Sequence, residues 1–176
     1  SIDDDKKTSN EQLKKVISRR FNFVRRGYSY RVTELEGALG CAQLERYKPM
    51  LTKRKHNGAY LQKHLAQFND HLQLPWYPKH ADHVFMMFPI VIKKKSSVQK
   101  VELTHFLETH NIETRDMLPL INQPYNIAIF GKLEPKYPVA KWINNNGFYI
   151  ASHPMLSQSE RSYIVRVFKE FFASRR

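Results

Sequence analysis

The run from His83 to Lys93, HVFMMFPIVIK, is apolar over nearly its whole length and constrains the fold more than any other segment. Its length and its β-branched and aromatic residues predict a buried strand. Pro89 lies within the run, and because proline cannot donate a backbone hydrogen bond to a neighbouring strand, it predicts a sheet edge or a bulge at that point. A buried strand has to be paired with other strands and covered by helices, so the flanking sequence must provide both.

Helices are predicted ahead of this strand. Capping boxes, in which a serine or threonine is followed three residues later by Glu or Gln, occur at Ser9–Gln12 and at Thr33–Glu36. The first begins a short helix, and the second begins the longest helical stretch of the chain. Pro49 is expected to end or kink that stretch near Tyr47, and a further helix is expected from Met50 to Phe68.

Behind the strand, helical and extended patterns alternate. The expected order is a helix at Val98–His110, a short strand at Ile112–Arg115, an irregular segment at Met117–Tyr137, a helix at Val139–Asn145, a strand at Phe148–Ala151 and a last helix behind a capping box at Ser157–Glu160. Gly147 is expected to end the helix before it as a left-handed cap. This order predicts an α+β fold: a small, mostly antiparallel sheet with helices on one face, preceded by long helices.

Two of these helices have a clear apolar side. In the helix expected at Val98–His110, the residues expected to face inward are Val101, Leu103, Phe106 and Leu107. Those on the stripe of the last helix are Ile164, Val167, Phe168 and Phe171. Stripes of this kind are typical of helices that pack one side against a core.

The chain is strongly basic. Its 176 residues include 29 Lys and Arg against 16 Asp and Glu, a formal net charge of +13. Such a balance attracts polyanions, so a nucleic acid is one candidate partner. The basic residues are nevertheless scattered over short runs in different predicted elements, which is typical of solvated surfaces. Because phosphorylated small molecules are attracted by the same field, nucleic acid is the less favoured partner.

Composition also bears on the compartment. No run reaches the ~20 apolar residues of a membrane-spanning helix, and the acidic segment Ser1–Asp5 does not resemble a signal peptide. The single cysteine, Cys41, cannot form an internal disulfide, which favours the cytoplasm. Cys41 lies among small residues of a predicted helix and is expected to be a buried space-filler.

The sequence contains no complete catalytic motif. The two glycine-rich phosphate-binding motifs are missing, and His80 and His83 have metal-like spacing without further ligands, so no metal site is predicted. Three polar places remain: the segment Gly27–Arg31, the arginine of Glu113–Arg115 and the histidine of Ser152–Pro154. Glycine lets a backbone approach a ligand closely, and arginine pairs with phosphate through two hydrogen bonds. On residue types alone, a turn at Gly27–Arg31 and a structural role for the histidine of Ser152–Pro154 are equally possible.

In their order, these places resemble a known family. The segment Gly27–Leu35, GYSYRVTEL, followed by Ala42–Glu45 and Arg54, is similar to a motif of the sugar aminotransferases named DegT/DnrJ/EryC1/StrS. Later blocks agree in order: Phe88–Ile90, Asn111–Arg115, Pro119–Leu120, Gln123–Tyr125, Pro138–Ala140, Gly147–Ile150 and His153–Pro154. The resemblance extends from about Ser9 to Phe172.

The resemblance implies a fold-type-I enzyme that uses pyridoxal phosphate as its electron sink. This chain would be the C-terminal portion, with residues 1–31 as the tail of the large cofactor-binding domain and a dimer-facing loop, and residues 32–176 as the small domain with its leading helices. Family members are homodimers that convert keto-sugar nucleotides to amino sugars, usually with glutamate as amino donor. Their catalytic lysine lies upstream of the region represented here. No catalytic residue is therefore expected in this chain, which alone should be inactive.

The resemblance also implies roles for individual residues. Ser29 stands where the family usually has an asparagine that reaches the cofactor phosphate across the dimer. Arg31 is expected near the partner subunit's active site, where it attracts the anionic substrate. Arg115 and His153 match positions near the substrate entrance, and Ile121 replaces a common histidine of the sugar-recognition loop.

Two alternatives stay open. One branch of the family has histidine in place of the lysine and uses pyridoxamine phosphate to dehydrate a sugar, and the deciding residue is not in this chain. The other alternative is a non-catalytic, basic nucleic-acid-binding module.

Overall fold

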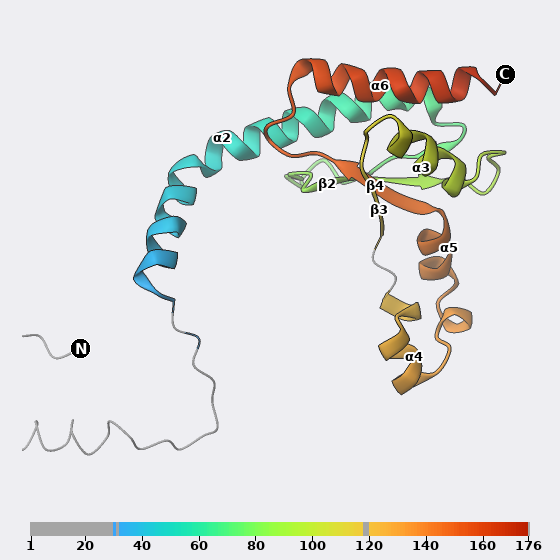
Figure 1. The fold of residues 1–176 in the computed structure, drawn as a ribbon, viewed down its shortest axis with the longest axis horizontal. Helices are drawn as coiled ribbons and strands as arrows, with labels where there is room; N and C mark the ends of the chain where they lie inside the picture. Colours follow the sequence, from blue (N-terminus) through green and yellow to red (C-terminus); the bar gives the residue numbers. More distant parts are fainter. Residues whose placement is uncertain (1–29, 31, 118–119, 176) are drawn as a thin grey trace, which may run out of the picture. The chain divides into compact units, whose positions relative to one another are not determined.

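The computed structural model describes Tyr30 and residues 32–117 and 120–175. It has an α+β fold, as predicted (Figure 1). The elements in chain order are α2 (Glu34–Leu65), η1 (Ala66–Phe68), β1 (Leu72–Gln73), β2 (Met87–Ile92), α3 (Lys100–Thr109), β3 (Thr114–Asp116), η2 (Leu120–Asn122), α4 (Pro124–Phe130), η3 (Glu134–Lys136), α5 (Pro138–Asn146), β4 (Gly147–Ala151) and α6 (Gln158–Ala173). The chain divides into two compact units, Ser1–Cys41 and Ala42–Arg176, and the sheet belongs to the second.

A four-stranded antiparallel sheet, in the order β1-β2-β4-β3, forms the centre of the second unit. β2 pairs with β4 over five residues, with Phe88 opposite Ile150. The three predicted strands are therefore confirmed, whereas β1 lies between the predicted helix Met50–Phe68 and the predicted strand His83–Lys93, where no element was predicted. β2 is an inner strand, yet β1 reaches only Val91 and Ile92. Pro89 therefore has a described strand on one side only, that of β4. The sheet edge predicted at Pro89 is present at this residue, although β2 as a whole is an inner strand.

The core lies on one face of the sheet. Strand residues Phe88, Ile90, Phe148 and Ile150 are fully buried in one cluster with side chains of α2, α3 and α6. Figure 1 shows α3 and α6 on this side of the sheet, and α4 and α5 on the other. The predicted stripe of the last helix is confirmed, because all of its members are buried: Ile164, Val167, Phe168 and Phe171.

Helix α3 begins two residues later than predicted, and one of its expected core residues faces solvent. Leu103 and Leu107 are fully buried, as expected, but Val101 is 67% exposed. Residues two positions apart in a helix are separated by about 200° around its axis. Val101 and Leu103 therefore cannot both face the core, and the two leucines set the buried side.

Helix α2 runs without a break through Pro49, so of the end or kink expected near Tyr47 the end is wrong. A proline inside a helix removes one backbone hydrogen bond, that to the carbonyl of Glu45 four residues earlier. Glu45 and Pro49 are both exposed, so water can satisfy that carbonyl. The hydroxyl of Thr52 also donates to the carbonyl of Lys48, at 3.1 Å, which adds a bond beside the interruption.

The capping box that begins α2 is confirmed. The backbone N–H of Glu36 donates to Oγ1 of Thr33 at 3.3 Å, and that of Thr33 donates to Oε2 of Glu36 at 2.8 Å.

The predicted burial of Cys41 is wrong, because its side chain is exposed. Small residues permit close packing but do not enforce it, and a Cβ added at Gly40 would meet nothing within 4 Å.

Glycine at position 147 has another role than the predicted one. Its φ of −99° is extended, so it is not a left-handed cap but the first residue of β4. An added Cβ would lie 2.5 Å from the carbonyl oxygen of Ile143 and 2.8 Å from the sulfur of Met117. Glycine is needed here because α5 leads directly into β4 and leaves no room for a side chain.

The segment predicted to be irregular contains a short helix, α4. Pro124 occupies the first turn of this helix, where a missing N–H costs nothing, so the proline starts the helix instead of excluding it.

None of the helices in the described part of the chain combines the length and the apolar character that spanning a bilayer requires.

The capping box of α6 gives a first testable expectation. The N–H of Glu160 donates to Oγ of Ser157 at 3.2 Å, and the N–H and hydroxyl of Ser157 each donate to the Glu160 carboxylate at 2.7 Å. These bonds, the side-chain one first, lower the pKa of Glu160. We expect Ser157→Ala to reduce the free energy of unfolding by about 1 kcal/mol.

The same bonds make this contribution dependent on pH. Because the pKa of Glu160 is lower in the folded than in the unfolded state, its contribution is present above the unfolded value of about 4.3 and is lost as the pH falls through the folded value. Urea unfolding of Ser157→Ala and the parent chain at neutral and acidic pH measures this. The difference between them should shrink in acid, and a difference that stays constant would contradict the expectation.

Candidate functional site

One face of the sheet is only partly covered. Alternation along the strands places Met87 and Pro89 of β2 and Tyr149 and Ala151 of β4 on this face, and the register places Arg115 of β3 opposite Tyr149. These five residues are half-buried or exposed, in contrast to the buried residues between them. They are called the open sheet face below.

A shallow pocket of about 190 Å³ on this face is lined by Glu113, Arg115, Tyr149 and Ala151. Oε1 of Glu113 accepts hydrogen bonds from Nε and Nη2 of Arg115, at 2.9 and 2.8 Å. The bond to Glu113 and then its charge raise the pKa of Arg115, with a smaller contribution from Tyr149. The side chains of the pair are 65% and 68% exposed, so water screens their attraction. The guanidinium is thus fully charged, and it can exchange Glu113 for another anion.

His153 lies in the turn between β4 and α6. Its Nδ1 accepts a hydrogen bond from the backbone N–H of Met155 at 3.1 Å, so the proton of the neutral ring is assigned to Nε2. Its backbone carbonyl accepts from Nδ2 of Asn57 at 2.7 Å. The preceding Ser152 is buried, whereas His153 is exposed. The turn therefore presents an Nε2–H donor at the surface.

The structure does not place the two described residues of the predicted site, Arg115 and His153, in one pocket. Arg115 shares its pocket with Tyr149, while His153 follows Ala151 by two residues and does not line that pocket. Ser29 and Arg31 lie outside the described residues.

Sequence reasoning missed Tyr149 and Asn57. The partial exposure of Tyr149 follows from the strand register, and the only sequence signal for Asn57 is an amide on the side of a helix that is otherwise apolar.

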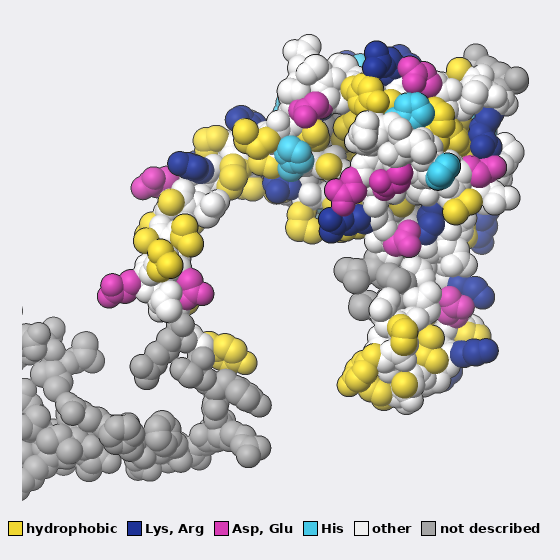
Figure 2. Space-filling view, in the orientation of Figure 1, with side chains coloured by type: hydrophobic (Ala, Val, Ile, Leu, Met, Phe, Trp, Pro, Cys, Tyr) yellow, Lys and Arg dark blue, Asp and Glu magenta, His cyan; other side chains and the backbone are white. Residues whose placement is uncertain are grey.

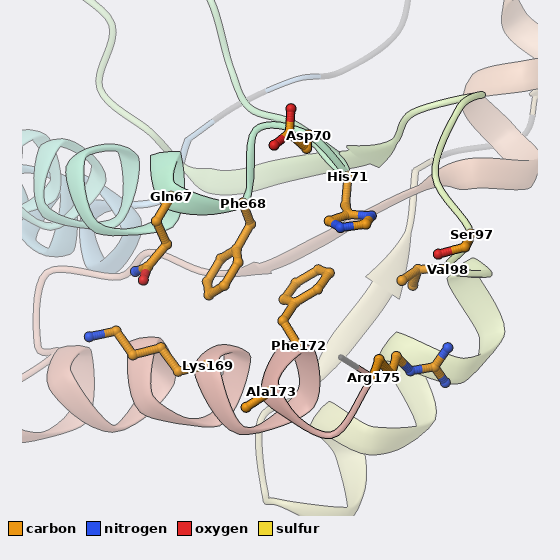
Figure 3. A pocket seen from close by; sticks show the side chains of 10 residues that line it. All are labelled: Gln67, Phe68, Asp70, His71, Ser97, Val98, Lys169, Phe172, Ala173 and Arg175. Atoms are coloured by element: carbon orange, nitrogen blue, oxygen red, sulfur yellow. The ribbon is translucent and has the colours of Figure 1, made fainter.

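A second, larger cavity of about 410 Å³ lies between η1 with the turn after it, the loop before α3 and the end of α6 (Figure 3). Phe172 stacks between Phe68, at 4.4 Å between ring centroids, and His71, at 5.1 Å. At its rim, Arg175 is paired with Glu102 at 3.0 Å. Its aromatic residues thus pack on one another, and neither Arg115 nor His153 lines it.

No cluster of three or more metal-ligating side chains occurs among the residues that the structure describes. Nδ1 of His83 accepts from the N–H of Phe85 at 3.1 Å, and its ring stacks on Tyr77. This histidine therefore has a structural role within its loop.

Comparison with known proteins gives a consistent result. The sequence model described as the DegT/DnrJ/EryC1/StrS aminotransferase family matches residues 3–169. The lipopolysaccharide biosynthesis protein RfbH of Salmonella typhimurium is 33% identical over 155 residues, which are 87% of this chain and 36% of that protein. GDP-perosamine synthase of Escherichia coli O157:H7 is 26% identical over 149 residues, which are 85% of this chain and 39% of the synthase.

Among solved structures, the chain is similar to GDP-4-keto-6-deoxymannose-3-dehydratase with a trapped PLP-glutamate geminal diamine. The TM-score is 0.68 at 25% identity, over 90% of this chain and 40% of that one. The chain thus spans about two fifths of the length of the proteins that it matches. Because the family match extends over nearly the whole sequence, this chain belongs to the DegT/DnrJ/EryC1/StrS aminotransferase family.

Proposed function

We propose that this chain forms the C-terminal part of a pyridoxal-phosphate-dependent aminotransferase that acts on a keto-sugar nucleotide, with glutamate as amino donor. The observation that carries the proposal is the family match over residues 3–169. The similarity to GDP-perosamine synthase supports the substrate class. The PLP-glutamate adduct in the similar dehydratase supports the cofactor and the donor. When bound, the cofactor supplies the electron sink of the reaction.

The pocket of the open sheet face does not fit the cofactor itself. The pocket of the open sheet face is lined by Glu113, Arg115, Tyr149 and Ala151, and it offers no lysine amine. Ser29, proposed for the cofactor phosphate across the dimer, and Arg31, proposed for the substrate, lie outside the described residues. The described part is therefore proposed to contribute substrate contacts only, and the chain alone is proposed to be inactive.

Arg115 and His153 are the proposed substrate contacts. A sugar nucleotide carries a diphosphate, and an exposed guanidinium such as that of Arg115 pairs with phosphate oxygens through two hydrogen bonds. His153 offers the N–H of its Nε2 as a donor, which suits a hydroxyl or carbonyl oxygen of a sugar. The two residues would hold different parts of one extended ligand, because Arg115 lies opposite Tyr149 and His153 lies four residues further on, beyond the end of β4.

Residues 1–31 are proposed to be the tail of a large domain with a dimer-facing loop, and residues 32–176 the small domain of a homodimer. Exposed apolar side chains support further interfaces. Leu35 and Leu39 of α2 are exposed, and so are Tyr125 and Phe130 of α4. Figure 2 shows hydrophobic side chains gathered over α4.

A cytoplasmic location is proposed from the single cysteine.

A second candidate function is the dehydration of a keto-sugar nucleotide, with pyridoxamine phosphate as the cofactor. The specific observation in its favour is the similarity to a named 3-dehydratase in both sequence and structure. The two functions differ in their product, since an aminotransferase adds an amine and a dehydratase removes water. The identity of the residue at the lysine position would distinguish them as well.

The test is to express the complete reading frame that encodes this chain and to record the absorbance of the purified protein. We expect a band of bound pyridoxal phosphate and, with glutamate and a GDP- or dTDP-linked 4-keto sugar, an aminated product by mass spectrometry. Loss of water from the sugar would favour the dehydratase. A protein that binds no cofactor, but binds oligonucleotide with a steep salt dependence, would overturn both proposals in favour of a nucleic-acid module.

A further inference from the structure

A buried amide on α2 links three parts of the second unit. Asn57 is 1% exposed, and both ends of its side chain are engaged. Nδ2 donates to the backbone carbonyl of His153 at 2.7 Å, and Oδ1 accepts from Nη1 of Arg161 on α6 at 2.6 Å. Asn57 thus connects α2, α6 and the turn between β4 and α6. A buried amide that loses one of these partners is left unsatisfied, so the geometry is strongly specified.

Arg161 is held without a described carboxylate. Its Nη1 also contacts Nδ1 of His56 at 2.6 Å, and its guanidinium lies over the ring of Tyr60, at 5.3 Å from the centroid. No ion pair joins it to an acidic side chain among the described residues. The cation instead polarises the amide of Asn57, and an amide whose oxygen accepts from a charged group is a stronger donor at its nitrogen.

The turn that receives this hydrogen bond is fixed at two points. The carbonyl of His153 accepts from Asn57, and Nδ1 of the same residue accepts from the N–H of Met155. With the backbone and the ring both held, the remaining ring nitrogen, Nε2, carries the proton and has a defined direction. His153 is exposed and follows Ala151, the last residue of the open sheet face, by two residues.

We propose that Asn57 and Arg161 are positioning residues, which hold the turn between β4 and α6 through the carbonyl of His153 and so present the Nε2–H of His153 to the substrate. This proposal rests on the proposed function of His153 as a substrate contact. Neither residue touches the substrate itself. Their effect is to lower the cost of ordering His153 when the ligand binds.

The variant Asn57→Asp separates positioning from packing. Aspartate has nearly the same shape and still accepts from Arg161, but it cannot donate to the carbonyl of His153. Tyr60→Phe is the matched control, because it removes a hydrogen bond between the same two helices, the one of 3.1 Å between the hydroxyls of Tyr60 and Ser162, and leaves Asn57 in place. Both variants thus lose one contact, and only one of these reaches the turn.

Two readouts are needed. The first is the ¹⁵N NMR signal of the His153 ring in the whole chain, which reports which nitrogen carries the proton and does not depend on activity. The second is KM for the keto-sugar nucleotide, measured with the product of the complete reading frame. We expect Asn57→Asp to average the ring signal between tautomers and to raise KM about three- to tenfold with little change in kcat. Tyr60→Phe should change neither.

A wild-type ring signal and a wild-type KM in a folded Asn57→Asp protein would overturn the inference. A changed KM with an unchanged ring signal would also overturn it, because the effect would then not act through His153. If His153→Ala leaves KM unaltered, the proposed substrate contact fails, while the ring signal of Asn57→Asp still decides whether Asn57 holds the turn.

Discussion

Replacing Gly58 by alanine is expected to destabilise this protein by about 1–3 kcal/mol, although the same replacement in a helix is ordinarily favourable. An ideal Cβ at this position would lie 2.3 Å from a ring carbon of Phe85. The ring cannot easily withdraw, because Phe85 is 2% exposed and has a φ of 55°, a strained backbone conformation for a large residue. The contact must therefore be relieved by a shift of α2 or of the loop before β2.

Urea unfolding measures this loss, and Gly40→Ala in the same helix is its control. Nothing lies within 4 Å of a Cβ at Gly40, so that variant should lose no stability and can gain up to about 1 kcal/mol from helix propensity. In the double variant Gly58→Ala/Phe85→Leu the second change should cost less than it does alone, because the smaller side chain makes room. Equal effects of alanine at positions 58 and 40 would contradict this account of the packing.

Removal of the Arg115 side chain is expected to raise KM for the keto-sugar nucleotide about 10- to 100-fold. Hydrogen bonds to charged groups contribute roughly 1.5–3 kcal/mol each, and about 1.4 kcal/mol corresponds to a factor of ten. The guanidinium is charged and exposed, and its partner Glu113 is exposed as well. We therefore expect Arg115→Ala to act on substrate binding and to leave the free energy of unfolding nearly unchanged. Steady-state kinetics with the product of the complete reading frame measures this.

Two further variants show whether the effect is local. Glu113→Gln should lower KM about two- to fivefold, because the competing carboxylate is removed from Arg115. Arg166→Ala is the charge-matched control, since it removes one positive charge from α6, where Arg166 pairs with Glu170 at 3.6 Å. If Arg166→Ala raises KM as much as Arg115→Ala does, the substrate responds to the overall charge and not to the open sheet face.

Much of the secondary structure could be predicted because the signals are local. A capping box uses groups only three residues apart, and the boxes at Thr33 and Ser157 begin helices as expected. The stripe of α6 follows from the period of apolar residues within the helix, and β2 follows from a continuous apolar run of strand length. The family, too, was identified from short motifs in a fixed order, and the match over residues 3–169 confirms it.

The errors arose where a distant segment decides the outcome. β1 is a strand only because the end of β2 is available to pair with it. Whether Cys41 is buried depends on what packs against its helix, and its small neighbours state only what is permitted. At Gly147 the glycine was recognised as necessary, but the reason is the contact with Ile143 and Met117 and not its φ.

The sequence by itself determined the types of most elements, the α+β class, the family and the identity of Arg115 and His153 as candidates, because these depend on patterns within a few residues of the chain. Only the tertiary structure decided which face of the sheet is open, that Glu113 competes for Arg115, and that Asn57 ties the turn of His153 to α2 and α6. Asn57 and His153 are 96 residues apart, and so distant a contact leaves no periodic signal in a single sequence.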